Sequence, residues 1–292
     1  MTTIPAGRVD LEVYALPSHL LIPGATPPPD LAPVAIVLDV VRATSAMVGL
    51  FERGATRIHV ARDLASGRWL ADREPGRYVD FGEDVFGRRA PGFTWATSPT
   101  EHAAAPVAGR EVVFCTVNGT GCIHAAVAAG ARAVLLGSFR NARAVADRAA
   151  DLALAHDAPV VVVGSGRFAN RSAALEDVYC GGYIGRLVVE RLAAAGRKLR
   201  IGDSQRIAEA LLQVYPSRLV ALRDSGSGRG LIANGAPDAD FEFCAALDTT
   251  DIVPEVCTDG RRPRYPVDLV QVAGAGDREP GAIEAPAAGE RQ

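Results

Sequence analysis

The feature that most constrains how this chain can fold is an alternation of apolar strand-like runs with helix-like segments, which continues from residue 34 to residue 196. Runs such as VAIVLDV (34–40), EVVFC (111–115) and PVVVVGSG (159–166) have the length and the β-branched content of buried strands. Longer segments with helical periodicity separate them, for example residues 141–156 and 172–196. Because parallel strands need a long crossover connection, usually a helix, this order predicts an α/β protein with a largely parallel sheet. We expect three layers, α/β/α, with helices on both faces of the sheet.

Further elements follow the same pattern. Strands are predicted at residues 10–16, 57–61, 77–82 and 131–137, and helices at residues 44–54, 61–73, 98–105 and 121–130. Ser98 and Glu101 have the spacing of a capping box at the start of the short helix 98–105. Ser172 is the predicted cap of the long helix 172–196.

The alternation weakens after residue 200, where helix-like segments follow one another. We therefore expect an α/β core at residues 1–200 and a C-terminal α/β portion at residues 201–272. The C-terminal portion either packs on the core or forms a smaller second lobe. Residues 273–292 are rich in Gly, Pro, Ala and charge, which predicts a disordered tail.

The composition narrows the class of partner. The net charge is -3, so the chain lacks the basic surplus that would attract nucleic acid or an anionic membrane. The N-terminus MTTIPAGRVD does not resemble a signal peptide and no apolar run is long enough to span a membrane, which predicts a cytoplasmic protein. The five cysteines include no Cys-x-x-Cys pair, which argues against a disulfide framework and a zinc knuckle. The sequence does not decide whether the protein forms a homo-oligomer, and this possibility stays open.

Polar residues gather where three of the predicted strands turn into helices. In a parallel sheet the carboxyl ends of the strands meet at one edge, and the helix N-termini there favour anions through free N–H groups and the helix dipole. The residues concerned are Asp39, Arg42, Thr44 and Ser45 at the first junction, Asn118, Gly119 and Thr120 at the second, and Ser165, Gly166, Arg167, Glu176 and Asp177 at the third. Asn-Gly suits a hairpin turn, but the helical pattern after it predicts that it joins a strand to a helix.

These junctions predict a phosphate site. The guanidinium of Arg42 can fork onto phosphate oxygens, and the hydroxyl and N–H groups of the other junctions can donate to them. The acids Asp39, Glu176 and Asp177 would repel a phosphate unless a hard cation lay between. We therefore predict a Mg²⁺ ion held by Asp39 and by Glu176 or Asp177.

Taken in order, DVVRATSA (39–46), TVNGTG (116–121), GSFRNARAVA (137–146) and ALEDVYCGG (174–182) resemble the 2-phosphosulfolactate phosphatase family. The run FEFCAALDTTDIVPEV (241–256) also looks like the ending of that family, and the resemblance spans roughly residues 9 to 257. One segment departs from the family pattern: Ala96-Thr97-Ser98-Pro99 stands where Gly-Asn-Ser-Pro is usual.

The resemblance implies a Mg²⁺-dependent acid phosphatase that hydrolyses phosphate monoesters of 2-hydroxycarboxylic acids, with 2-phosphosulfolactate as the naming substrate, on the route to coenzyme M. On this hypothesis Arg42 and the N–H groups around Asn118 to Thr120 stabilise the charge on the phosphate oxygens. Ser98, Ser165 or Arg167 then receives the carboxylate or sulfonate of the substrate. A covalent phosphoenzyme on Asp39 stays open.

Two other interpretations stay open beside this one. The same junctions would suit a phospho-ligand or nucleotide-binding regulatory module without catalysis. Cys180 and Arg186 have the Cys-x5-Arg spacing of thiol-dependent phosphatases, although Cys180 falls inside the predicted helix 172–196.

Overall fold

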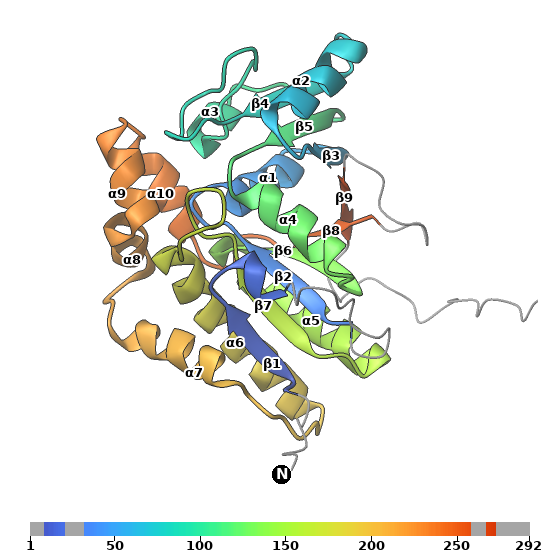
Figure 1. Ribbon diagram of the computed structural model, residues 1–292, viewed down its shortest axis with the longest axis vertical. Coiled ribbons are helices and arrows are strands. Elements are labelled where there is room, and N and C mark those ends of the chain that lie inside the picture. The colour runs from blue at the N-terminus through green and yellow to red at the C-terminus, as the bar shows by residue number, and fades with distance from the viewer. Residues whose placement is uncertain (1–8, 21–31, 258–266, 273–292) are drawn as a thin grey trace, which may run out of the picture.

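Nine strands form a single sheet in the computed structural model, which describes residues 9–20, 32–257 and 267–272 (Figure 1). The order across the sheet is β1-β7-β2-β6-β8-β9-β3-β5-β4. The strands are β1 (Leu11–Tyr14), β2 (Val34–Leu38), β3 (Arg57–Val60), β4 (Tyr78–Gly82), β5 (Glu111–Cys115), β6 (Ala133–Gly137), β7 (Val160–Gly164), β8 (Val253–Val256) and β9 (Val267–Val272). β1, β7, β2 and β6 are parallel, and so are β3, β5 and β4.

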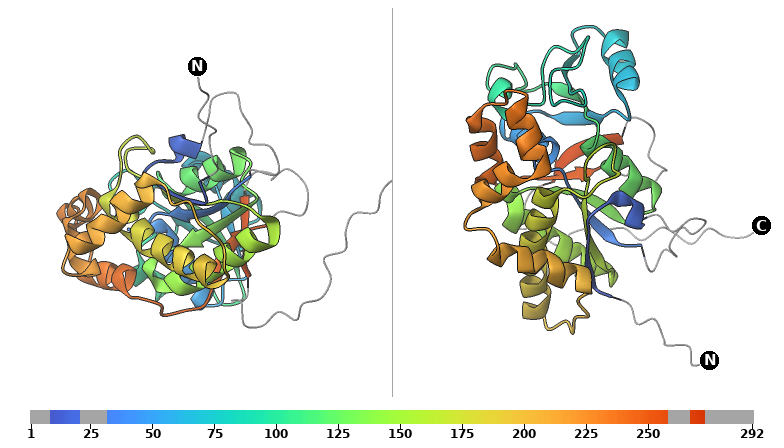
Figure 2. Two further views of the ribbon diagram at one scale, coloured as in Figure 1. Left: turned by 90° about the horizontal axis from the view of Figure 1, so that it is seen from below. Right: turned by 60° about the vertical axis from the view of Figure 1, so that its left-hand side comes forward.

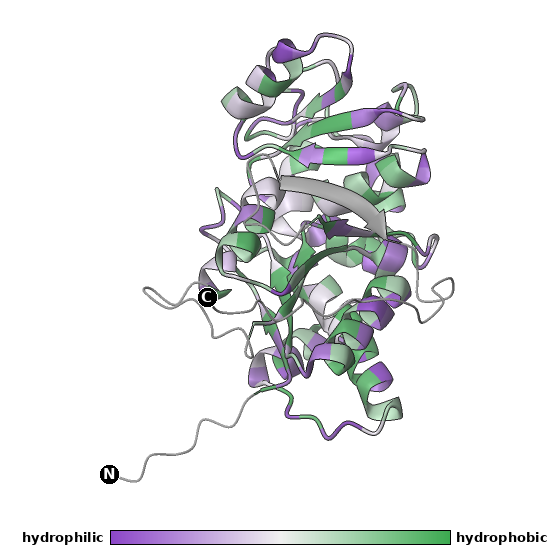
Figure 3. Ribbon diagram, turned by 90° about the vertical axis from the view of Figure 1, so that its right-hand side faces the viewer, coloured by the Kyte–Doolittle hydropathy of each residue, from purple (hydrophilic) through white to green (hydrophobic). Residues whose placement is uncertain are grey.

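Helices cover both faces of the sheet, which confirms the predicted three-layer α/β/α architecture. The ten α-helices within the described residues are α1 (Ala43–Glu52), α2 (Leu64–Arg73), α3 (Pro99–His102), α4 (Gly119–Ala128), α5 (Ala142–His156), α6 (Leu175–Ala194), α7 (Asp203–Ala210), α8 (Arg218–Asp224), α9 (Gly226–Ala233) and α10 (Asp238–Ala245). α1 and α4 share one apolar core with alternate residues of β2, such as Ala35 and Val37. α5 and α6 share the other core with Ile36 and Leu38. The alternation of β2 between two cores explains why its sequence is apolar throughout. In Figure 3 the parallel strands around β2 are mostly coloured as hydrophobic.

The C-terminal residues take two places in this fold. β8 and β9 form an antiparallel pair in the middle of the sheet, where β8 pairs with β6 and β9 pairs with β3. α7 packs on α6 and β1, whereas α8, α9 and α10 lie together beside α3 (Figure 2). The C-terminal part of the chain therefore both joins the two parallel groups of strands and reaches the carboxyl edge of the sheet.

The structure corrects two predicted helix caps. Ser98 is the N-cap residue of α3, but its hydroxyl donates to Asp240, and Glu101 accepts from the backbone N–H of Ala96, so the capping box does not form. The N-cap of α6 is Ala174, and no side chain caps this helix. Ser172 instead lies in a turn whose backbone pairs with Arg167.

The predicted tail, residues 273–292, lies outside the described residues. None of the described helices is long and apolar enough to cross a bilayer. The cytoplasmic location and the homo-oligomer stay predictions.

Candidate active site

The three predicted junctions meet at the carboxyl edge of the sheet. β2 and β7 are adjacent, and Leu38 pairs with Gly164, so Asp39 and Ser165 follow at the same level. α4 crosses back from β5 and its N-terminus reaches this point: a Cβ atom on Gly119 would lie 2.7 Å from Asp39 Oδ2. Only glycine permits this approach, which gives a steric reason for the Asn-Gly pair.

The loop after β7 closes over the start of α4. Asn170 Nδ2 donates to the Asn118 carbonyl at 3.1 Å, and the Ala169 N–H donates to Asn118 Oδ1 at 3.0 Å. Asn118 begins α4 as its N-cap residue, so the predicted change from strand to helix at Asn118-Gly119 is confirmed. Asn118 therefore holds the loop after β7, which is the third junction, against the start of α4, which is the second.

Asp177 ties the first junction to the third. Its Oδ1 accepts from the Val40 N–H at 2.9 Å, and its Oδ2 accepts from Ser165 Oγ at 3.2 Å and from the Gly166 N–H at 3.1 Å. Burial, followed by the charges of Glu176 and Asp39, raises the pKa of Asp177 well above its usual range. Both carboxylate oxygens are already satisfied by the fold, so Asp177 is placed to position the loops.

Asp39 is buried beside Gly119 and receives little compensation for its charge. Its Oδ1 accepts from the Ala43 N–H at 3.3 Å. Burial, together with the charges of Glu83 and Glu176, raises the pKa of Asp39 to about 7. A carboxylate held in this way is destabilising unless a cation or a proton neutralises it.

Glu176, at the start of α6, is the third buried acid. Its side chain is 2% exposed, and its Oε2 has no hydrogen-bond partner among the described residues. Burial raises the pKa of Glu176, although Ser227 and Ser225 oppose the shift. A buried and unpartnered carboxylate oxygen next to Asp39 suggests a missing ligand, because such atoms are rare in native structures.

The acids fit a magnesium ion in part. No three His, Cys, Asp or Glu side chains within the described ranges are grouped so that they alone hold a metal. Mg²⁺, however, is commonly bound by one or two carboxylates, with waters and substrate phosphate completing its shell. Asp39 and Glu176 supply the hard oxygen donors that this mode requires, and Glu176 Oε2 is free to serve.

A cavity of about 230 Å³ lies near these acids, although neither Asp39 nor Glu176 is among its described lining residues. Its lining comes from the loops after β2, β4, β5 and β7 and from α9, and includes Val41, Glu83, Asn118, Arg167 and Ser227. Arg167 is the one arginine among the described lining residues, and its guanidinium forms no hydrogen bond or ion pair with them. Phe86 and Phe168 also line the cavity and are largely exposed. The cavity therefore offers an uncommitted cation to an anionic ligand.

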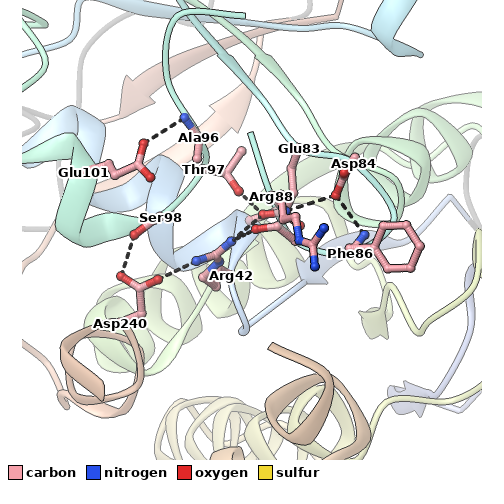
Figure 4. Close-up of polar contacts among 12 residues, drawn as sticks. Arg42, Glu83, Asp84, Phe86, Arg88, Ala96, Thr97, Ser98, Glu101 and Asp240 are labelled. Atoms are coloured by element: carbon pink, nitrogen blue, oxygen red, sulfur yellow. Dashed lines mark hydrogen bonds and ion pairs between the residues drawn. The ribbon is translucent and has the colours of Figure 1, made fainter. Parts of the chain in front are cut away.

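Arg42 is held in a buried network beside the cavity (Figure 4). Its Nη1 pairs with Asp240, and its Nη2 donates to Glu83 at 2.9 Å and to the Gly87 carbonyl at 2.6 Å. Asp240 also accepts from the hydroxyls of Ser98 and Thr100. The guanidinium is therefore already paired with two carboxylates, and its contact with a phosphate stays a prediction.

The profile of the family described as 2-phosphosulpholactate phosphatase matches residues 20–259. The chain is also 36% identical over 221 residues to a protein of Deinococcus radiodurans named probable 2-phosphosulfolactate phosphatase, which covers 76% of this chain and 86% of the relative. The chain belongs to the 2-phosphosulfolactate phosphatase family. Proteins with the same name from Thermus thermophilus (35% over 221 residues, 76% of this chain and 86% of the relative) and Symbiobacterium thermophilum (33% over 229 residues, 78% and 92%) are similar to it. Membership confirms the resemblance and the predicted enzyme class, a phosphoric monoester hydrolase.

The segment that departs from the family pattern lies next to the Arg42 network. Ala96 and Thr97 are buried, and the Thr97 hydroxyl donates to Glu83, which is itself a partner of Arg42. Neither residue is among the described residues that line the 230 Å³ cavity. The two replaced residues therefore help to hold Arg42 and the loop after β4 in place, and they do not form part of the cavity wall.

Several residues predicted to bind the substrate are engaged within the fold. Their side chains are buried, and their hydroxyls donate to the backbone or to an acid: Thr44 to the Asp39 carbonyl, Ser45 to the Val40 carbonyl, Thr120 to the Thr116 carbonyl, Ser165 to Asp177 and Ser98 to Asp240. Gly166 donates its N–H to Asp177. These residues shape the loops, and their contact with a substrate stays a prediction.

The thiol of Cys180 is buried within α6. Burial, with a further contribution from the charge of Asp177, raises its pKa well above the usual range. A thiol-dependent phosphatase needs an accessible thiolate with a lowered pKa. The geometry therefore argues against the alternative based on Cys180 and Arg186.

Sequence reasoning missed Asp240, which lies in the first turn of α10 and is 1% exposed.

Asp240→Ala is expected to lower the free energy of unfolding by about 3 kcal/mol or more, because it leaves the charge of Arg42 buried with one carboxylate partner fewer. Denaturant unfolding at pH 7 measures this. Asp238→Ala is the matched control: Asp238 lies in the same helix, its side chain is 68% exposed, and its pair with Arg223 is a surface ion pair that contributes less than about 1 kcal/mol. If Asp240→Ala and Asp238→Ala lowered the free energy of unfolding equally, the buried network around Arg42 would not be an important source of stability.

Proposed function

We propose that this protein is a Mg²⁺-dependent phosphatase that hydrolyses phosphate monoesters of 2-hydroxycarboxylic acids, with 2-phosphosulfolactate as the first substrate to test. The observation that carries the proposal is the pair of buried acids, Asp39 and Glu176, near a cavity lined by Arg167, whose guanidinium has no carboxylate partner among the described residues. Membership of the family supports it, and three relatives carry the name of this activity.

Each group of the site has a part in this proposal. The N-terminus of α4 at Gly119 would bind the phosphate, because the helix dipole there favours an anion. Arg167 would receive the carboxylate of the substrate, since its guanidinium matches a planar acid and, among the described residues, contacts only the Phe168 ring, 4.6 Å from its centroid, without an acidic partner. Asp39 and Glu176 would hold Mg²⁺, which, when bound, neutralises phosphate charge and orients or acidifies the attacking water.

The remaining polar residues would keep these groups in place. Asp177 fixes the loops after β2 and β7, and Asn118 fixes the loop after β7 on α4. Such positioning accounts for a large share of catalysis in phosphoryl transfer, where the protein supplies little covalent chemistry. A cytoplasmic location and a place on the route to coenzyme M belong to the same proposal.

Phosphate release from a panel of phosphate monoesters tests the proposal. The panel contains 2-phosphosulfolactate, 2-phospholactate and phosphoglycolate, with phosphoserine as a monoester that lacks the 2-hydroxy acid structure. We expect release from the 2-hydroxy acid esters with Mg²⁺, loss of release with EDTA, and recovery when Mg²⁺ is restored. Binding of these esters without any metal-dependent release would instead favour the non-catalytic ligand-binding module.

A further inference from the structure

A second cavity of about 210 Å³ adjoins the first one. The two share four lining residues, Phe86, Gly87, Leu231 and Asn234, so one ligand can contact both. Arg42, Arg88 and Arg89 line the second cavity, and Glu101 is the acid among its described lining residues. The first cavity contains a single arginine, so cations are concentrated on the side of the second.

The partners of these arginines differ. Arg89 donates to the carbonyls of Phe93 and Thr94 at 3.4 and 3.3 Å. Arg42 is paired with two carboxylates, yet its Nε is buried and has no acceptor among the described residues. Glu101 is exposed and accepts from the backbone N–H of Ala96 at 3.1 Å. The charge of Arg42 is therefore already used within the fold, and the exposed arginines of the second cavity are Arg88 and Arg89.

Neither Arg88 nor Arg89 has a carboxylate partner among the described residues, and Arg88 is the one whose guanidinium contacts the wall shared by the two cavities. Its Nη2 donates to Asn234 Oδ1 at 2.9 Å, and its guanidinium lies over the Phe86 ring, 5.5 Å from the centroid. Both of these partners lie on the wall shared by the two cavities. Figure 4 shows the guanidinium of Arg88 beside Phe86, on the side of Arg42. Arg88 is thus oriented by neutral groups at the boundary between the cavities.

We propose that the second cavity receives an additional acid group of the substrate, and that Arg88 selects substrates that carry one. This inference rests on the proposed function, in which Arg167 takes the carboxylate next to the phosphate ester. Arg167 and Arg88, neither of which has a carboxylate partner within the described part of the chain, then match the two acid groups of a substrate such as 2-phosphosulfolactate. The fork of Arg88 suits a sulfonate or a second carboxylate, and a lysine would not reproduce it.

A comparison of two substrates tests the proposal. 2-Phospholactate carries one acid group beside the phosphate ester, and 2-phosphosulfolactate carries two. Arg88→Met is expected to raise KM for 2-phosphosulfolactate about 10- to 100-fold while changing KM for 2-phospholactate by less than about 3-fold, because only the first loses a charge-assisted hydrogen bond. Arg88→Lys should recover only part of the loss. Arg229→Met is the control, because Arg229 is exposed on α9 and is not among the described lining residues of either cavity, and the ratio of the two KM values should stay as in the wild type.

Equal changes for both substrates, or no change for either, would overturn the role of Arg88. Asn234→Ala provides a second variant, which keeps the arginine but removes its anchor, and should shift the KM ratio in the same direction by a smaller factor. A wild-type protein that hydrolyses neither ester would count against the proposed function itself. A wild-type protein that hydrolyses both, with a KM ratio unmoved in Arg88→Met, would refute the further inference alone.

Discussion

Asp39→Asn is expected to lower kcat about 10³-fold or more while making the metal-free protein more stable above pH 7. The loss of activity follows because the substitution removes the carboxylate proposed to hold Mg²⁺ beneath the phosphate, an interaction worth several kcal/mol in the transition state. The gain in stability follows from burial: the folded protein raises the pKa of Asp39 to about 7, so its ionised form is disfavoured in the native state.

The stability of the wild type depends on pH through the raised pKa of Asp39. The pKa of Asp39 in the folded protein lies above its ordinary value of 3.8, so its favourable contribution is complete below about pH 4 and is lost as the pH rises to about 7. Asparagine does not titrate. The variant should therefore match the wild type near pH 4 and exceed it by up to about 4 kcal/mol at pH 8 in EDTA.

Denaturant unfolding of both proteins in EDTA and in Mg²⁺ measures these differences. Mg²⁺ should stabilise the wild type at pH 8 and leave Asp39→Asn unchanged, because a ligand stabilises only the state that binds it. Asp72→Asn is the control, since Asp72 forms an exposed ion pair with Arg68 on α2. If Asp39→Asn kept its activity, or if Mg²⁺ stabilised it as much as the wild type, Asp39 would not belong to the metal site.

Glu176→Gln is expected to lower kcat about 10²- to 10³-fold without lowering the free energy of unfolding. Its Oε2 has no partner among the described residues, so the fold loses no hydrogen bond at that atom, whereas the proposed site loses a carboxylate. Steady-state kinetics and denaturant unfolding separate the two effects.

Glu190→Gln serves as the control on the same helix, since the side chain of Glu190 is 54% exposed. It should leave both quantities near the wild type. An active Glu176→Gln enzyme with unaltered kcat would remove Glu176 from the metal site. A large loss of stability in Glu176→Gln would show instead that this acid supports the fold.

The alternation of strands and helices between residues 34 and 196 was enough to predict the layers of the fold, because each element there carries its own periodicity. β8 and β9 were missed for a physical reason. β8 has only four residues and contains Pro254, and both strands are held in the sheet by pairing with β6 and β3, which are remote in sequence. Nothing local to residues 253–256 indicates that the segment enters the middle of a sheet.

The convergence of Asp39, Asn118 and Asp177 could be expected, because the carboxyl ends of parallel strands share an edge. The partners of Arg42 could not be predicted in the same way. Asp240 lies 198 residues from Arg42, on a helix that belongs to no strand junction, and it also draws the Ser98 hydroxyl away from the predicted cap. Long-range ion pairs of this kind leave no periodic signal in the sequence.

A crystal structure with Mg²⁺ and inorganic phosphate would show directly whether Asp39 and Glu176 hold a metal ion next to a bound phosphate. We expect phosphate in the cavity lined by Asn118 and Arg167, at the N-terminus of α4, with Mg²⁺ bound by the carboxylates of Asp39 and Glu176. Phosphate bound away from that cavity, with Asp39 and Glu176 in contact with no cation, would contradict this expectation.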